Sequence, residues 1–234
     1  MTKTANSAKQ YGILVDMDYC LGCGICVIAC KQENNLPPFT DDEPTAGGHA
    51  WNQVLSITNG KYPDLSRHYL PVHCMHCEEP PCLPACPKDA IYKREDGFVL
   101  IAKGKCNACV DQPDGVMKCV PACPYGAIQF NEQKGVVEAC TLCVHRIDAD
   151  PKAQPACVRA CIGRCLSFGD FNDPNSAVSN KTKLAGKENV FVLKPEKNIG
   201  PAIKYIKPKG VSVDKVARLD LSEKMYGFKK QSHV

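Results

Sequence analysis

The sequence predicts an α+β fold of short strands and short helices, organised by metal binding more than by a large apolar core. Three observations support this prediction. The 234 residues include 17 cysteines but only one tryptophan and seven phenylalanines. Sixteen of the cysteines fall into four groups of four, and short apolar segments bounded by turn residues lie between the groups. A chain of this length can form one or two domains with modest cores.

The four cysteine groups, called quartets below, share one spacing rule. Each begins with a CxxC pair and ends with a CxxxC pair, whereas two, four, nine or thirteen residues separate the pairs. A surface loop of variable length between fixed ligand pairs explains this pattern, because such loops tolerate insertion. In chain order the quartets are Cys20, Cys23, Cys26 and Cys30; Cys74, Cys77, Cys82 and Cys86; Cys106, Cys109, Cys119 and Cys123; and Cys140, Cys143, Cys157 and Cys161.

The third quartet carries the nine-residue insert VDQPDGVMK between its two pairs. Pro113, Asp114 and Gly115 stand in turn-forming order, so the insert can leave and return without displacing Cys109 and Cys119. We therefore expect this quartet to bind a cluster as the others do. The insert is a candidate for adjusting the exposure of that cluster or for contacting a partner.

The spacing favours iron–sulfur clusters as the cofactors that these cysteines bind. Three thiolates close in sequence can bind three iron corners of one cubane, and in two-cluster ferredoxins the fourth cysteine crosses to the other cluster. Pro87 and Pro124 follow Cys86 and Cys123, as expected where the chain must turn away. A structural zinc protein is an alternative, because CxxC pairs also bind zinc. Disulfides are a weaker alternative, because we find no secretory signal.

Strand signals separate the quartets. The segment GILVDMD, residues 12–18, precedes the first quartet. Residues 90–106 predict a hairpin that turns at Asp96 and Gly97, and residues 127–140 predict another that turns near Gly135. We expect the helices to be short and to follow the cysteine runs. These elements predict a repeated, small ferredoxin-like α+β unit in which the bound clusters complete each core.

Cys165 is the seventeenth cysteine and lies outside the quartets. Aligning CPKDAI, CPYGAI and CIGRCL places it where the second and third repeats have Ala90 and Ala127. We expect Cys165 to fill a small buried space. A role as an alternative ligand to Cys161 is the other interpretation, because Ile162 replaces the usual proline.

The charge is unevenly distributed along the chain. Residues 1–180 contain 16 Lys and Arg against 20 Asp and Glu, whereas residues 181–234 contain 13 against 5, which gives net charges of −4 and +8. The basic segment could dock on an acidic partner or an anionic membrane surface, or form a solvated extension. Basic residues are not interleaved with stacking aromatics, so a nucleic-acid partner is not expected.

The sequence shows neither a membrane span nor an export signal. No apolar run approaches the roughly 18 residues that cross a bilayer. The segment MTKTANSAKQYG has no apolar signal region and no twin-arginine pair. We therefore expect any export to depend on another protein.

His76 in CMHC and His145 in CVHR are candidates for adjusting cluster potentials, because hydrogen bonds to sulfur shift them. Packing or an ordinary backbone hydrogen bond is the alternative role for each histidine. Neither replaces a cysteine of a quartet, so a Cys–His zinc site is not expected.

Six signatures together carry a family resemblance: CLGCGICVIACKQEN, HCMHCEEPPCLPACPKDAI, CPYGAI, CTLCVHRID, PACVRAC and FGDFNDPNSAVS. Over residues 11–205 the sequence resembles the four-cluster iron–sulfur (beta, electron-transfer) subunits of the dimethyl sulfoxide reductase superfamily of molybdopterin oxidoreductases. Such subunits serve dimethyl sulfoxide, polysulfide, thiosulfate, tetrathionate and arsenate reductases. The sequence departs from the pattern in the insert of the third quartet and at Ile162.

The resemblance implies two ferredoxin-like halves, each with two 4Fe–4S clusters, and exchange of the last cysteine between paired quartets. Residues 11–70 and 131–180 would form the first half, with an inserted loop over 31–70, and residues 71–130 the second. Residues 181–234 would be a basic C-terminal extension. The spacing alone leaves the pairing of quartets open. The implied ligand sets are Cys20, Cys23, Cys26 and Cys161; Cys74, Cys77, Cys82 and Cys123; Cys106, Cys109, Cys119 and Cys86; and Cys140, Cys143, Cys157 and Cys30.

The implied function is electron transfer, with no catalytic residues in this protein. Single electrons would pass between a molybdenum or tungsten bis-pterin site in a large subunit and a redox partner such as a quinone-linked membrane anchor, as in anaerobic respiration. A free-standing polyferredoxin shuttle is the alternative. The 43 residues between Cys30 and Cys74, with Trp51 and Tyr62, exceed what cluster binding needs and favour docking surfaces.

The implied location is the periplasmic side, after export with a signal-bearing partner, with the cytoplasm as the alternative.

Overall fold

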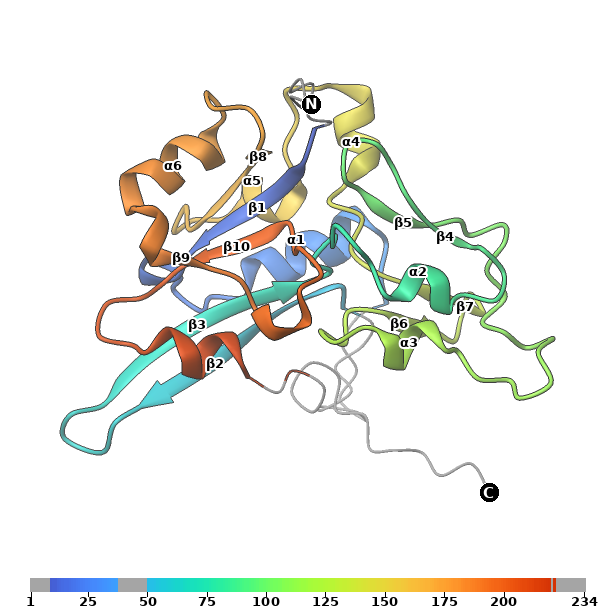
Figure 1. The fold of residues 1–234 in the computed structure, drawn as a ribbon, viewed down its shortest axis with the longest axis horizontal. Helices are drawn as coiled ribbons and strands as arrows, with labels where there is room; N and C mark the ends of the chain where they lie inside the picture. Colours follow the sequence, from blue (N-terminus) through green and yellow to red (C-terminus); the bar gives the residue numbers. More distant parts are fainter. Residues whose placement is uncertain (1–8, 38–49, 220, 222–234) are drawn as a thin grey trace, which may run out of the picture.

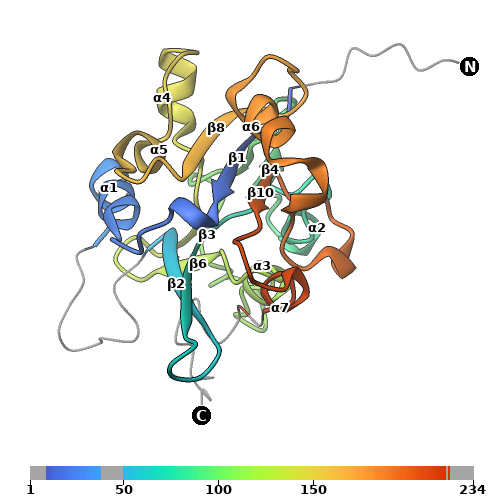
Figure 2. The same ribbon diagram turned by 90° about the vertical axis from the view of Figure 1, so that its left-hand side faces the viewer.

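The computed structural model describes residues 9–37, 50–219 and 221 (Figures 1 and 2). Within these residues, four strands form the largest sheet. Strand β1 runs parallel to β10 and antiparallel to β8, and β9 pairs antiparallel with β10. In spatial order the strands are β8 (Leu166–Asp170), β1 (Tyr11–Asp16), β10 (Ile203–Ile206) and β9 (Val190–Phe191).

The predicted strand at residues 12–18 is confirmed as β1, which ends at Asp16. Ile13, Leu14 and Val15 are consecutive and all buried, as expected for a strand covered on both faces. Ile13 lies opposite Ile203 on one side and Phe168 on the other. After β1 the chain turns through the short 3-10 helix η1 (Met17–Tyr19) into the first quartet.

Hairpins make up the remaining strand pairs that the structure describes. The long pair β2 (Asn52–Asn59) and β3 (Ser66–His73) extends away from the four-stranded sheet, and the pairs β4 (Ile91–Lys93) with β5 (Val99–Ile101) and β6 (Gln129–Asn131) with β7 (Val136–Glu138) lie on the other side of the molecule (Figure 1). The two short hairpins confirm the sequence prediction. Gly97 and Gly135 take φ values of 91° and 62° in their turns, which glycine adopts without strain. The long hairpin was not predicted.

The helices are short, as the sequence predicts. They are α1 (Ile25–Glu33), α2 (Cys82–Ala85), α3 (Cys119–Ala122), α4 (Val144–Ala149), α5 (Ala156–Ala160), α6 (Ala177–Ala185), α7 (Val213–Ala217), and the 3-10 turns η2 (Lys187–Asn189) and η3 (Pro195–Lys197). In the described ranges no helix has both the length and the apolar character that a bilayer crossing requires.

The expectation that helices follow the cysteine runs is wrong for α1, α2, α3 and α5, which contain quartet cysteines. Each of these helices lies over a CxxxC pair. Cys26 and Cys30 are both within α1, whereas Cys86, Cys123 and Cys161 follow α2, α3 and α5 in extended backbone conformation. α1 packs against α5, and α2 packs against α3.

Buried residues of the described ranges form two clusters. The smaller one, called the hairpin core below, consists of Cys82, Cys86, Ala90, Ile91, Val99, Cys119, Ile128 and Val137. The larger one, called the sheet core, joins the four-stranded sheet to α1, α5 and the long hairpin. β5 lies between them, because Val99 belongs to the hairpin core while its neighbours Phe98 and Leu100 belong to the sheet core. This alternation is the normal period of a strand.

The segment predicted as a basic extension, residues 181–234, includes parts of the sheet core. Ile203 and Tyr205 on β10 are fully buried, and the Tyr205 hydroxyl donates to the carbonyl oxygen of Pro71 at 3.0 Å. Its last residues, 222–234, lie outside the described residues. Trp51, expected as part of a docking surface, is only 4% exposed and packs in the sheet core, whereas Tyr62 at the tip of the long hairpin is 89% exposed.

Candidate metal-cluster sites

One cavity of about 290 Å³, including space open to solvent, is bordered by four thiols. Three come from the third quartet, Cys106, Cys109 and Cys119, and the fourth is Cys86 of the second quartet. Cys119 begins α3, and Cys86 immediately follows α2. Apolar side chains complete the lining, including Ile91, Ile101, Met117 and Val137.

A second cavity, of about 440 Å³ on the same measure, shows the converse arrangement. Cys74, Cys77 and Cys82 of the second quartet border it together with Cys123 of the third. Cys123 immediately follows α3. Because α2 and α3 lie against each other, each short helix presents its first cysteine to one cavity and the cysteine after it to the other.

The nine-residue insert does not separate the pairs of the third quartet, since Cys109 and Cys119 border one cavity. The predicted turn is present: the Asp114 carboxylate accepts from the backbone N–H of Val116 at 3.2 Å, and Gly115 has φ 58°. Asp111 of the insert pairs with Lys88, which lines the cavity. Met117 of the insert lines the cavity itself, so the insert forms part of its wall.

A third set of thiols gathers where α1 meets the fourth quartet. Burial raises the pKa of Cys140 well above its ordinary value, and the neighbouring thiols of Cys30, Cys157 and Cys143 raise it further. Cys30 belongs to α1 and Cys157 to α5. The last cysteine of the first quartet thus lies among three cysteines of the fourth.

The fourth set lies at the start of α1. Burial raises the pKa of Cys26 to about 11, and the nearby thiols of Cys20, Cys161 and Cys23 add to the shift. Cys161 is the last cysteine of the fourth quartet, and it lies near three cysteines of the first. Cys23 is exposed, and Cys20 and Cys161 are half-buried.

The CxxC loops share a backbone conformation that the sequence analysis did not identify. The residue just before the second cysteine has a positive φ in every quartet: 66° at Gly22, 43° at His76, 52° at Ala108 and 51° at Leu142. Only glycine adopts this region without cost. Only Gly22 could have indicated this conformation from the sequence, because histidine, alanine and leucine do not predict a positive φ.

Hydrogen bonds to sulfur are numerous. Backbone N–H groups donate to Cys86, Cys123, Cys106 and Cys140 at 3.4 Å and to Cys143 at 3.5 Å; their donors are Ala90, Ala127, Val137, Leu142 and Ala156. Donors of this kind stabilise the thiolate form that a metal requires.

The donor chemistry of the four sets fits an iron–sulfur cluster. Burial, followed by the neighbouring thiols, raises the pKa of Cys30, Cys82 and Cys119 to about 12. Four such groups cannot lose their protons together unless positive charge lies between them. Iron held by four thiolates supplies that charge.

In the parts of the sequence that the structure describes, no group of three Cys, His, Asp or Glu side chains is arranged to hold a single metal ion. The thiols of the two cavities instead border the space between them.

The two candidate histidines occupy different environments. His76 is fully buried, and its Nδ1 accepts the backbone N–H of Val99 at 3.0 Å. Burial, followed by the neighbouring His73, lowers the pKa of His76 to about 3, so its ring is neutral. An ordinary backbone hydrogen bond is therefore its observed contact.

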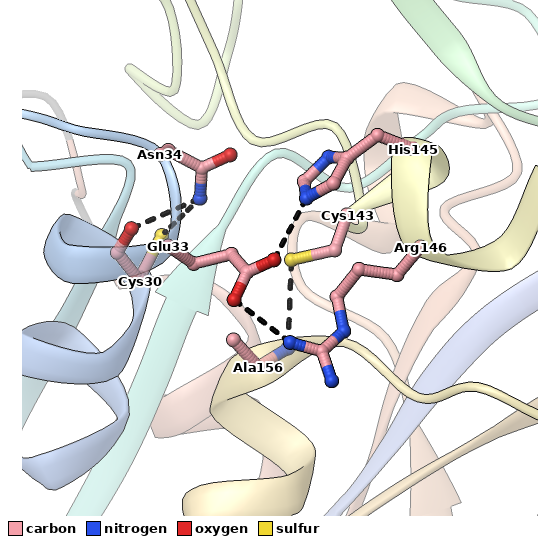
Figure 3. A network of polar contacts seen from close by, with 7 residues as sticks. All are labelled: Cys30, Glu33, Asn34, Cys143, His145, Arg146 and Ala156. Carbon is pink, nitrogen blue, oxygen red and sulfur yellow. Dashed lines mark hydrogen bonds and ion pairs between the residues drawn. The ribbon is translucent and has the colours of Figure 1, made fainter. Parts of the chain in front are cut away.

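His145 instead belongs to a surface network that joins α4 to α1 (Figure 3). Its Nε2 lies 2.8 Å from Oε1 of Glu33, and Arg146 donates to Oε2 of Glu33 at 2.7 Å. These contacts lower the pKa of Glu33, with the His145 bond as the largest cause. In the same view Asn34 points at Cys30, its Nδ2 lying 3.7 Å from the sulfur (Figure 3).

Comparison with known proteins gives a consistent set of relatives. A family described as "4Fe-4S dicluster domain" matches residues 65–171. The sequence is 37% identical over 208 residues to the B subunit of the sulfite dehydrogenase of Allochromatium vinosum, covering 84% of this protein and 82% of that one. It is 32% identical over 250 residues to the arsenate respiratory reductase iron–sulfur subunit of a Shewanella species, with 86% and 98% covered. It is 35% identical over 195 residues to the B component of the anaerobic dimethyl sulfoxide reductase of Escherichia coli, with 82% and 89% covered.

Proposed function

Because this protein belongs to the iron–sulfur subunits of the dimethyl sulfoxide reductase superfamily of molybdopterin oxidoreductases, we propose how its cysteines divide four clusters and which face meets its partner. The protein is a non-catalytic electron-transfer subunit with four 4Fe–4S clusters. Its relatives are named as parts of larger enzymes, which favours this function over a free-standing shuttle.

The paired quartets exchange their last cysteines in this proposal. The single observation that carries it is the mixed lining of two cavities, each with three thiols of one quartet and one of the other. Around α1 and α5, Cys161 raises the pKa of Cys26 and Cys30 raises the pKa of Cys140, which supports the same exchange. The proposed sets are Cys20, Cys23, Cys26 and Cys161; Cys74, Cys77, Cys82 and Cys123; Cys106, Cys109, Cys119 and Cys86; and Cys140, Cys143, Cys157 and Cys30.

The hairpin core lies in the second ferredoxin-like half of the proposal, and the sheet core contains residues of both halves. Hairpin β6–β7 crosses the boundary between residues 130 and 131, where the sequence interpretation ended the second half, and Val137 packs in the hairpin core. We therefore extend the second half through β7. The first half includes β10, which supports counting the segment around Ile203 with it rather than with a separate extension.

A bound 4Fe–4S cluster takes up and releases one electron at a time. The residues of this protein determine how each cluster is held. Ile91 borders both cavities and keeps an apolar wall between the two thiol sets. Backbone donors such as the N–H groups of Ala90 and Ala127 stabilise negative charge on the ligand sulfurs.

The face around Cys23 is the proposed contact with the catalytic subunit. Tyr19, Leu21 and Ile162 are each 63% exposed, next to an exposed ligand. A Cβ built on Gly163 would lie 3.5 Å from Leu21 Cγ, so Leu21 lies beside Gly163, the residue that follows Ile162. Clustered exposed apolar side chains mark interaction sites. This proposal gives the replacement of proline by Ile162 a role.

We also propose a quinone-linked membrane anchor and a location on the periplasmic side. The support is the naming of relatives as respiratory and anaerobic reductases. Cell fractionation tests this location. Recovery of the entire complex in the cytoplasm would refute the location and leave the electron-transfer role unchanged.

Purification of the native complex tests the partnership. We expect a larger pterin-bearing subunit in fixed ratio with this protein, and four clusters per copy by iron and sulfide analysis. Leu21→Glu should weaken that association while all four clusters remain, because it places a charge in an apolar contact. Leu184→Glu is the matched control, since Leu184 is 88% exposed on α6. A monodisperse protein that needs no larger subunit would contradict the proposal.

A further inference from the structure

One position distinguishes the quartets that are otherwise alike. It lies four residues after the last cysteine of each quartet. Asn34, Ala90, Ala127 and Cys165 occupy it in chain order. All four contact, through backbone or side chain, the sulfur of that last cysteine.

The two alanines contact the sulfur only through the backbone. The N–H of Ala90 lies 3.4 Å from Cys86 Sγ, and that of Ala127 lies 3.4 Å from Cys123 Sγ. Both alanine side chains are fully buried. An alanine at this position is therefore sufficient for the backbone N–H to reach the cysteine sulfur.

Cys165 adds a polar side chain at the same position. Its Sγ lies 3.5 Å from Cys161 Sγ, and the Cys165 side chain is close enough to the Cys20 thiol to lower the pKa of Cys20 to about 7. Both neighbours belong to one proposed ligand set. Cys165 itself is only 4% exposed, and its carbonyl oxygen accepts the N–H of Asp16 at 2.8 Å, which fixes it at the edge of the sheet.

We propose that the Cys165 thiol donates an S–H···S hydrogen bond to the Cys161 sulfur of the cluster held by Cys20, Cys23, Cys26 and Cys161, and thereby raises the reduction potential of that cluster alone. The inference rests on the ligand sets proposed above. Cys165 is a positioning residue, because it acts through the ligands.

The physical reason is the charge that reduction adds. An added electron increases the negative charge on the cluster and its ligand sulfurs, so a donor aimed at those sulfurs stabilises the reduced state more than the oxidised state. Burial strengthens the effect, because a hydrogen bond is electrostatically stronger at low dielectric. A thiol is a weak donor, but alanine at this position offers no side-chain donor.

The test is a potentiometric titration of the purified complex, followed by electron paramagnetic resonance, for wild type, Cys165→Ala and Cys165→Ser. We expect all variants to keep four clusters. The Cys165→Ala variant should lower the midpoint potential of one cluster and leave the other three unchanged. Cys165→Ser, which keeps a donor, should return that potential toward the wild-type value.

The shifted signal must be the one that Cys26→Ser also alters, because Cys26 is assigned to the same cluster. An unchanged set of four potentials in Cys165→Ala would overturn the proposal, as would a shift in a different signal. Loss of about four irons in that variant would identify Cys165 as a ligand and also overturn it. The wild-type iron content separately tests the four-cluster function.

Discussion

At the hairpin core, the last cysteine of each quartet accepts a backbone N–H from an alanine four residues later. At the sheet core, the same position holds Asn34 and Cys165, whose side chains contact the sulfur of the preceding Cys30 or Cys161. The cysteine spacing is equivalent in both regions, so the spacing does not determine what surrounds the last sulfur of a quartet. The side chain at this position can therefore differ between clusters without disturbing the ligands.

The two regions also differ in how they are enclosed. The hairpin core is built from local pairs, because β4–β5 and β6–β7 are each formed by neighbouring segments. The sheet core needs contacts distant in sequence, such as Ile13 of β1 beside Ile203 of β10. We therefore expect substitutions at these distant contacts to disturb the sheet core more than the hairpin core.

Replacement of Ile203 by alanine should produce the largest difference in stability between the sheet core and the hairpin core. Ile203 is fully buried in the sheet core, and truncation of a buried isoleucine costs about 2–5 kcal/mol. The apparent melting temperature of the complex should fall, and the signal that Cys26→Ser alters should be lost before those of the hairpin core. Calorimetry and electron paramagnetic resonance during heating measure both.

Leu184→Ala provides the control, because Leu184 is 88% exposed and a surface change of this kind alters stability by less than about 0.5 kcal/mol. If Ile203→Ala caused simultaneous loss of all signals at the same temperature, the two cores would form one cooperative unit. The comparison would then fail.

A smaller effect should come from the CxxC loops. A Cβ on Gly22 would lie 2.5 Å from the Tyr69 ring, and its φ of 66° disfavours other residues. Gly22→Ala should therefore cost about 1–3 kcal/mol. Ala108→Gly, at φ 52° in the equivalent loop, should change stability less, because relief of strain is offset by greater freedom of the unfolded state.

Apparent melting temperatures and iron contents of the two variants measure this difference. Equal losses of stability would show that the shared positive φ does not explain the behaviour of the loops. A greater loss in Ala108→Gly would show that the Ala108 side chain, which lines the cavity, matters more than its backbone conformation.

The sequence predicted the features that are local in the chain. The turn at Asp96 and Gly97 and the turn near Gly135 are confirmed, because turn residues specify them. Strand β10 was missed, because Ile203–Ile206 is four residues long and lies in a lysine-rich stretch whose charge suggested a solvated segment. Its burial depends on pairing with β1, about 190 residues away in sequence.

The site showed the same division. The grouping of cysteines was readable from sequence, but the contact between Cys165 and the Cys161 sulfur was not, because the alignment with alanine indicated only a small space. Trp51 was misjudged for a related reason. An aromatic residue in a long loop resembles a docking residue until the strand that follows it places it in the core.

The exchange of last cysteines is tested most directly by two double variants examined with iron counting and electron paramagnetic resonance. Cys86→Ala with Cys109→Ala removes two ligands from one proposed cluster, whereas Cys86→Ala with Cys77→Ala removes one ligand from each of two. We predict the loss of one cluster signal in the first variant and of two in the second. Loss of two signals in the first and one in the second would show that each quartet holds its own cluster, and would contradict the exchange.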